Sequence, residues 1–337
     1  MIKQIIKTVD GNEATADVAY AFTEVATIYP ITPSSPMAEH VDVWAANGRK
    51  NLFGQPVKLV EMQSEAGAIG AVHGASETGS LCSSFTASQG LMLMIPVMHR
   101  LSGELKPVVL HVAARTVGTH TMSIFGDHSD VMGCRNTGWA MLCSASVQEC
   151  ADLAAVAHLS TIKGHVPFMH FFDGFRTSHE IQKISMLPED ELKKLIDKEA
   201  LYDFKHHGLN PEHPVIRSTV TNPDMFFQSR EANNSWYDRL PYIVEDYMDK
   251  ISELTGRTYK LFNYYGDPEA EHVVVAMGSV TGAIQEVVDS LNAQGKKVGY
   301  VQVHLFRPFS RKHLMAAMPK TVKKIAVLDR VKEIGCI

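Results

Sequence analysis

An alternation of short apolar segments with longer segments of helical spacing runs through residues 1–180, and it restricts the fold more than any other feature of this sequence. Apolar, β-rich runs are typical of buried strands, whereas apolar side chains three or four positions apart form one face of a helix. The alternation predicts a doubly wound, mainly parallel α/β sheet. The predicted strands are Thr27–Ile31, Lys58–Met62, Leu81–Thr86, Val108–Ala113, Ala140–Ser144 and Val166–Asp173.

Helices are expected between these strands. The first follows Asp10, which together with Asn12 is a candidate N-terminal cap. The other predicted helices of this region are Glu65–Glu77, Ser88–Leu101 and Val147–Lys163. His111 and His170 fall inside predicted strands, so we expect them to be hydrogen-bonded groups of the core.

The pattern changes twice along the 337 residues, a length for which we expect at least two domains. After the first domain, residues 1–180, the alternation is lost in residues 181–270. This stretch carries the acidic surplus of the chain and several prolines, which predicts a charged helical and irregular connector that packs on the first domain. Alternation resumes in residues 271–337, with strands expected at His272–Met277, Val298–Leu305 and Ile325–Asp329. Three parallel strands leave an open edge, so we expect residues 271–337 to be the front part of a longer α/β domain.

Residue spacing excludes several common uses of an α/β sheet. No two glycines are separated by a single residue, so the G-x-G-x-x-G turn of a dinucleotide-binding unit is absent. No P-loop and no H-E-x-x-H sequence occurs either. The five cysteines are never spaced as C-x-x-C, which argues against a disulfide framework, a zinc site or an iron–sulfur cluster within this chain. We therefore predict no metal site here.

Charge and hydropathy point to a cytoplasmic protein. The formal net charge of −5 argues against a nucleic-acid partner. The most apolar run, Leu91–Met98, is far shorter than the roughly 20 residues that a membrane span needs. We expect neither nucleic acid nor membrane as a partner.

Polar residues gather where predicted strands end, which is where open α/β sheets bind ligands. Thr32 lies between two prolines that stiffen the exit from the first strand; a rigid, capped loop is the alternative interpretation. Glu65 begins a helix rich in alanine and glycine, and such a helix lets a ligand approach closely. Glu65 is the best catalytic candidate, although a carboxylate favoured by the helix dipole explains the same pattern.

Arg115 follows the strand Val108–Ala113 and is suited to bind a carboxylate through two hydrogen bonds. A surface ion pair is the alternative. His128 with Asp127 and Asp130 is either a proton relay, a metal cluster or the capped start of a helix, with Asp127 as the cap; the capped helix is the preferred interpretation.

Longer motifs then identify a family. The sequence closely resembles the N-terminal part of pyruvate:ferredoxin (flavodoxin) oxidoreductases over essentially its whole length. The similar segments are Tyr29–Ser35, Glu61–Ala68, Phe85–Gly90, Ser123–His128, Phe171–Glu180, Asn210–Pro214, Asn222–Gln228 and Leu305–Ser310.

The resemblance implies a thiamine-diphosphate enzyme that decarboxylates pyruvate, passes electrons through iron–sulfur clusters to ferredoxin or flavodoxin, and transfers acetyl to coenzyme A. The first domain corresponds to the pyrimidine-binding domain. Glu65 matches the carboxylate that bonds the aminopyrimidine ring, and Arg115 and Thr32 match groups that contact pyruvate. Residues 271–337 match the start of a transketolase C-terminal-like domain.

The sequence lacks the Gly-Asp-Gly segment of the magnesium-diphosphate half-site and has no cluster cysteines. We therefore expect this chain to be inactive alone. Other domains or subunits are expected to supply Mg²⁺, the iron–sulfur clusters and coenzyme A binding, in a homodimer. Two alternatives remain open: the α subunit of a 2-oxoacid:ferredoxin oxidoreductase for branched-chain or aryl substrates, and a non-catalytic assembly module.

Overall fold

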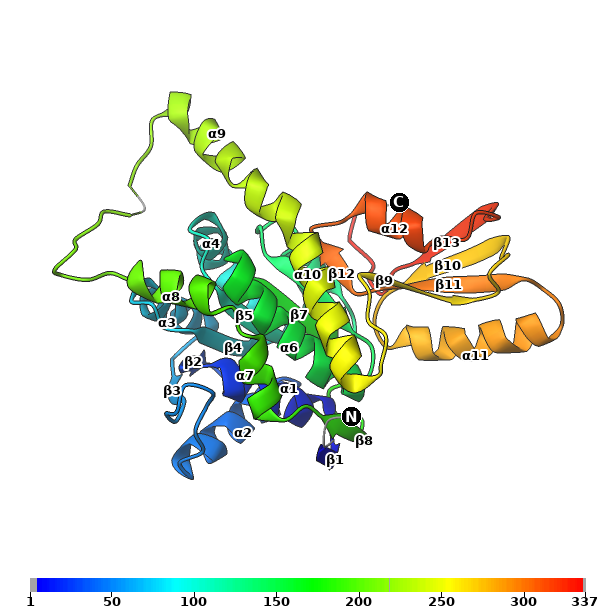
Figure 1. Cartoon of the computed structure of the whole chain (residues 1–337), viewed down its shortest axis with the longest axis horizontal. Coiled ribbons are helices and arrows are strands. Elements are labelled where there is room, and N and C mark those ends of the chain that lie inside the picture. The colour runs from blue at the N-terminus through cyan, green and yellow to red at the C-terminus, as the bar shows by residue number, and fades with distance from the viewer. Residues whose placement is uncertain (1–4, 218, 336–337) are drawn as a thin grey trace.

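The computed structural model describes residues 5–217 and 219–335. It contains two main sheets, each accompanied by helices. A seven-stranded sheet forms the larger body, and a four-stranded sheet projects from it (Figure 1). Within the described residues, no helix is both long and apolar enough to cross a membrane.

The larger sheet is parallel except at one edge, and its strand order is β12-β6-β7-β5-β4-β2-β3. The antiparallel edge strand β12 (Leu305–Arg307) pairs with β6. The six parallel strands are β2 (Val25–Ile28), β3 (Lys58–Glu61), β4 (Cys82–Thr86), β5 (Val108–Ala114), β6 (Ala140–Ser144) and β7 (Phe168–Asp173). This arrangement confirms the predicted mixed α/β fold with a mainly parallel sheet.

Helices cover both faces of this sheet, and polar side chains fix where several of them begin. Asp10 caps the first helix by accepting a hydrogen bond from the Glu13 N–H (2.8 Å), whereas Asn12 donates its side chain to the Pro33 carbonyl. The helices are α1 (Gly11–Phe22), α2 (Ser35–Ala46), α3 (Glu65–Glu77), α4 (Ser88–Gly103), α5 (Ser129–Gly133) and α6 (Val147–Gly164).

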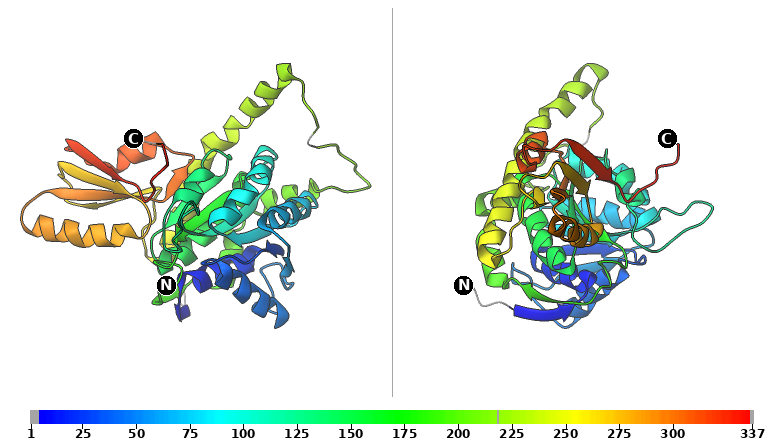
Figure 2. Two further views of the ribbon diagram at one scale, coloured as in Figure 1. Left: turned by 180° about the vertical axis from the view of Figure 1, so that it is seen from behind. Right: turned by 90° about the vertical axis from the view of Figure 1, so that its right-hand side faces the viewer.

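The stretch after β7 is largely helical, as its composition predicts, and runs along the outside of the larger sheet (Figure 1). It opens with β8 (Gln182–Met186), which pairs with β1 (Ile5–Val9) in a two-stranded antiparallel ribbon that the sequence pattern did not predict. The long helix α10 packs on α6, whereas α9 projects away from the larger sheet (Figure 2). The four helices are α7 (Glu189–Leu195), α8 (Lys198–His206), α9 (Pro223–Ala232) and α10 (Asn234–Thr255). The domain bounds stay a prediction.

The smaller sheet has the order β13-β10-β11-β9, with β10, β11 and β13 parallel. β9 belongs to the stretch assigned to the connector and adds an antiparallel edge strand. Two helices, α11 (Val280–Ala293) and α12 (Arg311–Ala317), accompany this sheet. Its strands are β9 (Phe262–Gly266), β10 (His272–Ala276), β11 (Val298–Val303) and β13 (Lys324–Leu328).

The strand predicted at Val298–Leu305 is wrong in extent, because the chain leaves one sheet for the other at His304. The His304 N–H donates to the Leu261 carbonyl beside β9, and its own carbonyl accepts from Cys143 in β6 (2.8 Å). The residues after it therefore form β12 at the edge of the larger sheet. His304 thus joins the two sheets through its backbone.

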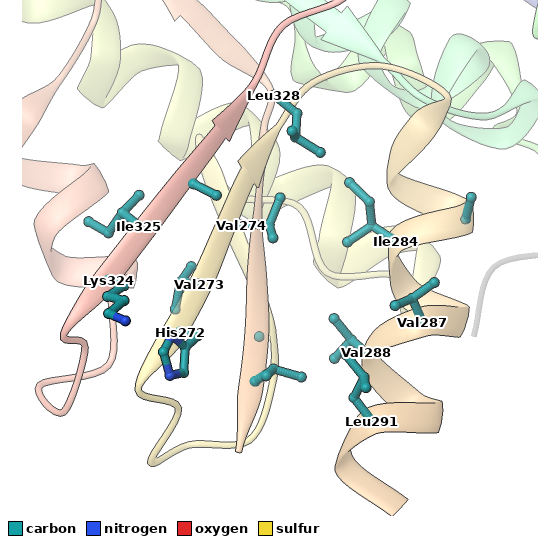
Figure 3. A pocket seen from close by; sticks show the side chains of 14 residues that line it. His272, Val273, Val274, Ile284, Val287, Val288, Leu291, Lys324, Ile325 and Leu328 are labelled. Atoms are coloured by element: carbon teal, nitrogen blue, oxygen red, sulfur yellow. The ribbon is translucent and has the colours of Figure 1, made fainter. Parts of the chain in front are cut away.

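An apolar groove of about 620 Å³ lies between α11 and the neighbouring strands β10 and β13 (Figure 3). Ile284, Val287 and Leu291 point into it from the helix, and Val274 and Leu328 face it from the sheet (Figure 3). α11 packs over β11 and β9 and leaves the same face of β10 and β13 uncovered. No described strand pairs with the outer edge of β13, so the open edge expected from the sequence is present within the described residues.

Three buried histidines form a hydrogen-bonded chain between the larger sheet and α6. The Nδ1 atoms of His111 and His170 are 3.0 Å apart, and the Nε2 atoms of His111 and His158 are 3.1 Å apart. Burial lowers the pKa of all three, to about 3 for His158 and His170. His111 and His170 are thus hydrogen-bonded core groups, as predicted, and the three rings are neutral at pH 7.

We expect the chain to lose stability below pH 7. The pKa of each folded-state ring lies below the ordinary 6.5, so the unfolded chain binds more protons in this range, and His158 and His170 each cost about 2 kcal/mol at pH 5. His158→Phe keeps the ring that stacks on Phe22 and removes one such site, so it should lose about 2 kcal/mol less than the wild type between pH 7 and 5. Urea unfolding at both pH values measures this, with the exposed His206→Phe as control. An equal loss in His158→Phe and the wild type contradicts the expectation.

Candidate active site

The three predicted site residues all follow strands of the larger sheet at its carboxyl edge. Thr32 follows β2, Glu65 follows β3 and Arg115 follows β5. These strands are parallel, so their carboxyl ends meet at one edge. The structure thereby gathers side chains that are far apart in the sequence.

Glu65 is the first residue of α3 and is buried, with 6% of its surface exposed. The Ser64 side chain caps the helix by accepting from the Gly67 N–H. A methyl group added at Gly90, in the first turn of α4, would lie 2.5 Å from Glu65 Oε1 and 2.7 Å from Thr86 Oγ1. Thr86 Oγ1 is buried without a partner, and no described residue donates a hydrogen bond to the Glu65 carboxylate. The absence of a side chain at Gly90 thus lets the Glu65 carboxylate and the Thr86 hydroxyl lie directly against the first turn of α4.

Asp130 ties the start of α4 to the end of β5. One oxygen of its fully buried carboxylate, Oδ2, accepts the backbone N–H groups of Ser88 (2.8 Å) and Arg115 (3.0 Å). Burial raises the pKa of Asp130 to about 6, although these N–H groups act in the opposite direction. Ser88 has a left-handed backbone (φ 53°), and its hydroxyl donates to Thr116 O (2.5 Å). A strained residue held by several hydrogen bonds is common at functional sites.

The Arg115 side chain is 7% exposed and only loosely held by the protein. Its Nη2 lies 3.5 Å from Gln89 Oε1, and its buried Nε has no partner. Burial lowers the pKa of Arg115, and Asp130 raises it in part, but a guanidinium stays charged in proteins. Gln89 precedes Gly90, so the first turn of α4 separates Arg115 from Glu65. The surface ion pair considered for Arg115 is absent from the described residues.

Thr32 is exposed on the loop after β2. The buried Asn12 side chain anchors this loop by donating to the Pro33 carbonyl (2.9 Å). A methyl group added at Gly174, just after β7, would lie 2.7 Å from Pro33 Cγ and 2.8 Å from the Ala114 carbonyl. The loop of Thr32 therefore lies beside the end of β5, but no hydrogen bond between described residues joins Thr32 to Glu65 or Arg115.

The cluster around His128 does not act as one unit. The Asp127 side chain accepts from the Ser129 N–H (2.7 Å), but the residue at the N-cap of α5 is His128, which makes no side-chain capping bond, so the prediction of Asp127 as the cap is wrong. Asp130 anchors backbone N–H groups, whereas His128 Nε2 donates to Asp173 Oδ1 (2.7 Å). These three side chains have separate structural partners in the described chain.

One group of described side chains, His73, Glu77 and Glu104, has the spacing to hold a metal ion. It lies toward the far end of α3, with Glu77 about 18 Å along the helix from Glu65. Lys106 and Arg217 already form ion pairs with Glu77, at 2.8 Å and 2.7 Å. This group is therefore not part of the Glu65 site.

Comparison with known proteins identifies the family. A family model described as pyruvate flavodoxin/ferredoxin oxidoreductase, thiamine diphosphate-binding, matches residues 17–249. A second, described as pyruvate:ferredoxin oxidoreductase core domain II, matches residues 270–336. The chain belongs to the pyruvate flavodoxin/ferredoxin oxidoreductase family. The resemblance that the sequence motifs indicate is thereby confirmed.

Curated relatives match nearly the whole chain. The pyruvate-flavodoxin oxidoreductase of Klebsiella pneumoniae is 62% identical over 330 residues, and the pyruvate:ferredoxin oxidoreductase of Moorella thermoacetica is 59% identical over 331. Each match covers 98% of this chain but 28% of the relative, so the chain spans just over a quarter of their length. A solved 2-oxoglutarate:ferredoxin oxidoreductase from Magnetococcus marinus shares the fold, with a TM-score of 0.70 and 20% identity over 98% of this chain and 59% of that one.

The contact between Gly90 and Glu65 predicts a steric effect on stability. Gly90→Ala should lower the free energy of unfolding by about 1–3 kcal/mol, because its methyl group enters the space of two polar side chains. Gly70→Ala is the matched control in α3: nothing lies within 4 Å of its added methyl group, and alanine favours a helix by about 1 kcal/mol. Urea unfolding of both variants provides the measurement. Equal midpoints would contradict the steric account.

Proposed function

We propose that residues 1–180 form the pyrimidine half of the thiamine-diphosphate site of a pyruvate:ferredoxin or flavodoxin oxidoreductase. The observation that carries the proposal is the buried Glu65 carboxylate, which has no described donor and lies against Gly90 at the carboxyl edge of the sheet. A carboxylate that binds the ring of a cofactor must keep an oxygen that no protein donor occupies. The match to a thiamine-diphosphate-binding family model supports the same assignment.

In this proposal Glu65 is the acid–base residue. Thiamine diphosphate, when bound, supplies the carbon nucleophile that attacks a 2-oxoacid and accepts the electron pair left when carbon dioxide departs. Glu65 binds the ring nitrogen of the aminopyrimidine through its carboxyl group and exchanges a proton there. Glu65 is the first residue of α3, so its side chain lies at the carboxyl edge of the sheet.

Arg115 and Thr32 bind the substrate in this proposal. Arg115 pairs with the carboxylate of the 2-oxoacid, because its guanidinium is buried, charged and lacks a firm protein partner. The Thr32 hydroxyl lies on an anchored loop and bonds the substrate oxygen at the reacting carbon. Together they orient the acid so that its carboxylate can leave.

Pyruvate is the proposed substrate because the two relatives described above are named for it. A branched-chain or aryl 2-oxoacid is the alternative substrate class. A non-catalytic assembly module is a weaker alternative, since Glu65, Arg115 and Thr32 are all retained at one sheet edge.

The rest of the proposed reaction belongs to parts of the enzyme outside this chain. These parts would hold the diphosphate with Mg²⁺, the iron–sulfur clusters and coenzyme A, and would pass electrons to ferredoxin or flavodoxin. We further propose a homodimer, because thiamine sites form between domains, and a cytoplasmic location, because four cysteines of the described chain are buried free thiols.

Glu65→Gln should lower the turnover number of the complete enzyme by roughly a few hundredfold or more, which is the order of a lost acid–base contribution. Steady-state oxidation of pyruvate with a reporter dye as electron acceptor measures this. Glu61→Gln, an exposed residue at the end of β3, is the matched control and should leave turnover unchanged. Unchanged turnover in Glu65→Gln would refute the assignment.

The substrate role of Arg115 makes a separate prediction. Arg115→Lys keeps the charge but loses the paired N–H groups, so the KM for pyruvate in the complete enzyme should rise by about tenfold or more. Comparing kcat/KM for pyruvate and 2-oxoisovalerate in the wild type tests the substrate class at the same time. A higher kcat/KM for 2-oxoisovalerate would favour the branched-chain alternative.

A further inference from the structure

Asp173 connects the two sheets at the carboxyl end of β7. Its side chain is fully buried, and both of its oxygens accept hydrogen bonds. His128 donates to Oδ1 (2.7 Å), whereas Arg330 Nη1 (2.6 Å) and the Ser279 N–H (2.8 Å) donate to Oδ2. Ser279 precedes α11 and Arg330 follows β13, so two of the three donors come from the smaller sheet's layer. The carboxylate thus fixes that layer to the strand that ends beside the substrate loops.

Arg330 reaches the backbone next to Arg115. Its Nε donates to the Gly126 carbonyl (3.1 Å), and Gly126 forms an antiparallel bridge with Arg115. The Arg330 carbonyl also accepts the His128 N–H (2.9 Å). Gly126 in turn lies against Asp173, since a methyl group added there would be 3.0 Å from Asp173 Cβ. Arg330 therefore binds the loop at Gly126, directly opposite Arg115 in the bridge.

Asp173 also acts toward the loop of Thr32 through the next residue. The Gly174 N–H donates to the Ala114 carbonyl (2.9 Å), directly before Arg115. Gly174 packs against Pro33 so closely that a methyl group would lie 2.7 Å from Pro33 Cγ. A shift of Asp173 would therefore move the backbone that separates Thr32 from Arg115.

We propose that Asp173 and Arg330 are positioning residues for the 2-oxoacid. Through their ion pair, the layer of the smaller sheet sets the placement of Arg115 and Thr32. This inference rests on the proposed function, because it takes Arg115 and Thr32 as the substrate-binding pair. Neither Asp173 nor Arg330 touches the substrate in this account. They act through Gly126 and Gly174, whose backbone bonds shape the two loops.

The charges in this cluster suit a fixed position. Burial alone would raise the pKa of Asp173, but the hydrogen bond and charge of His128, the Ser279 N–H and Arg330 hold it well below its usual range. Asp173 is therefore an anion at neutral pH, and a buried anion keeps its donors in place because losing one leaves its charge uncompensated. Such supporting contacts matter for catalysis, since a displacement of about 1 Å at a substrate-binding group can cost up to a hundredfold in rate.

The test compares three variants of the complete enzyme. Arg330→Gln removes the charge beside Asp173 and the bond to Gly126, and should raise the KM for pyruvate about tenfold, with a smaller change in kcat. Arg330→Lys keeps the charge but loses the Nε donor, so we expect an intermediate rise. Arg135→Gln is the matched control: Arg135 pairs with Glu333 (3.0 Å) between the same two layers but is half-exposed and does not touch the loop backbone at Gly126 or Gly174, so the KM should not change.

Thiamine diphosphate affinity, measured by fluorescence titration, separates positioning from general loosening. The expected result is an affinity equal to the wild type in Arg330→Gln and Arg330→Lys, since Glu65 lies on α3 and has no contact with this cluster. If Arg330→Gln fails to fold in a thermal melt, Arg330→Lys alone decides, because it retains the ion pair.

Three results would overturn the inference. One is an unchanged KM in the Arg330 variants while Arg115→Lys raises it, which leaves the proposed function intact. Another is a parallel loss of thiamine diphosphate affinity, which indicates general loosening. The third is an unchanged KM in Arg115→Lys itself, which removes the proposed substrate role and the inference together.

Discussion

Parallel pairing of β2, β3, β4 and β5 is the constraint on which the whole site depends. Each of these strands is followed by a loop or a helix that starts at the same edge, so polar residues separated by dozens of positions become neighbours. β2, β4 and β5 are almost entirely buried, which leaves the carboxyl edge as the place where hydrogen-bonding groups can face a ligand. Glu65 and Arg115 owe their proximity to α4 to this pairing and not to any local sequence signal.

Two buried carboxylates then fix the positions of the loops at this edge relative to one another. Asp130 accepts the N–H groups of Ser88 and Arg115, and so links the start of α4 to the end of β5. Asp173 accepts from His128, Ser279 and Arg330, and so links β7 to the smaller sheet. A buried charge is costly unless several donors surround it, and those donors are here backbone or side-chain groups of the loops themselves. The requirement to satisfy each carboxylate therefore orders the loops.

The sequence predicts the parts of this arrangement that have a local or periodic signal. Alternation gives the strands, and the start of an alanine- and glycine-rich helix singles out Glu65. The long contacts have no such signal: Arg330 and Asp173 are 157 positions apart, and nothing in either segment indicates the other. Asp130 was grouped with His128 as a possible relay or metal cluster because the two are close in sequence, but their side chains have different partners. The segment Ser88–Gly90 contributes to the family resemblance, but the sequence does not predict a role for its residues. Their contacts with Glu65 and Arg115 depend on α3 and β5 lying beside α4, which the sequence does not indicate. His304 was assigned to a continuous strand because periodicity cannot show where a strand changes sheets.

Two of the seven buried side-chain atoms that lack a hydrogen-bond partner in the described chain lie where the proposed ligands would bind. Thr86 Oγ1 and Arg115 Nε are buried without a hydrogen bond, and the Glu65 carboxylate has no donor among the described residues. A buried polar atom without a partner costs about 1–3 kcal/mol, and a ligand that pairs with the atom offsets this cost. An aminopyrimidine ring would donate to the Glu65 carboxylate once its ring nitrogen has accepted a proton, and a 2-oxoacid carboxylate would accept from Arg115. Hydrogen bonds that these atoms do not form in the folded chain would then form with the ligands and contribute to the free energy of binding. This connects the incomplete hydrogen bonding of the edge with its proposed function.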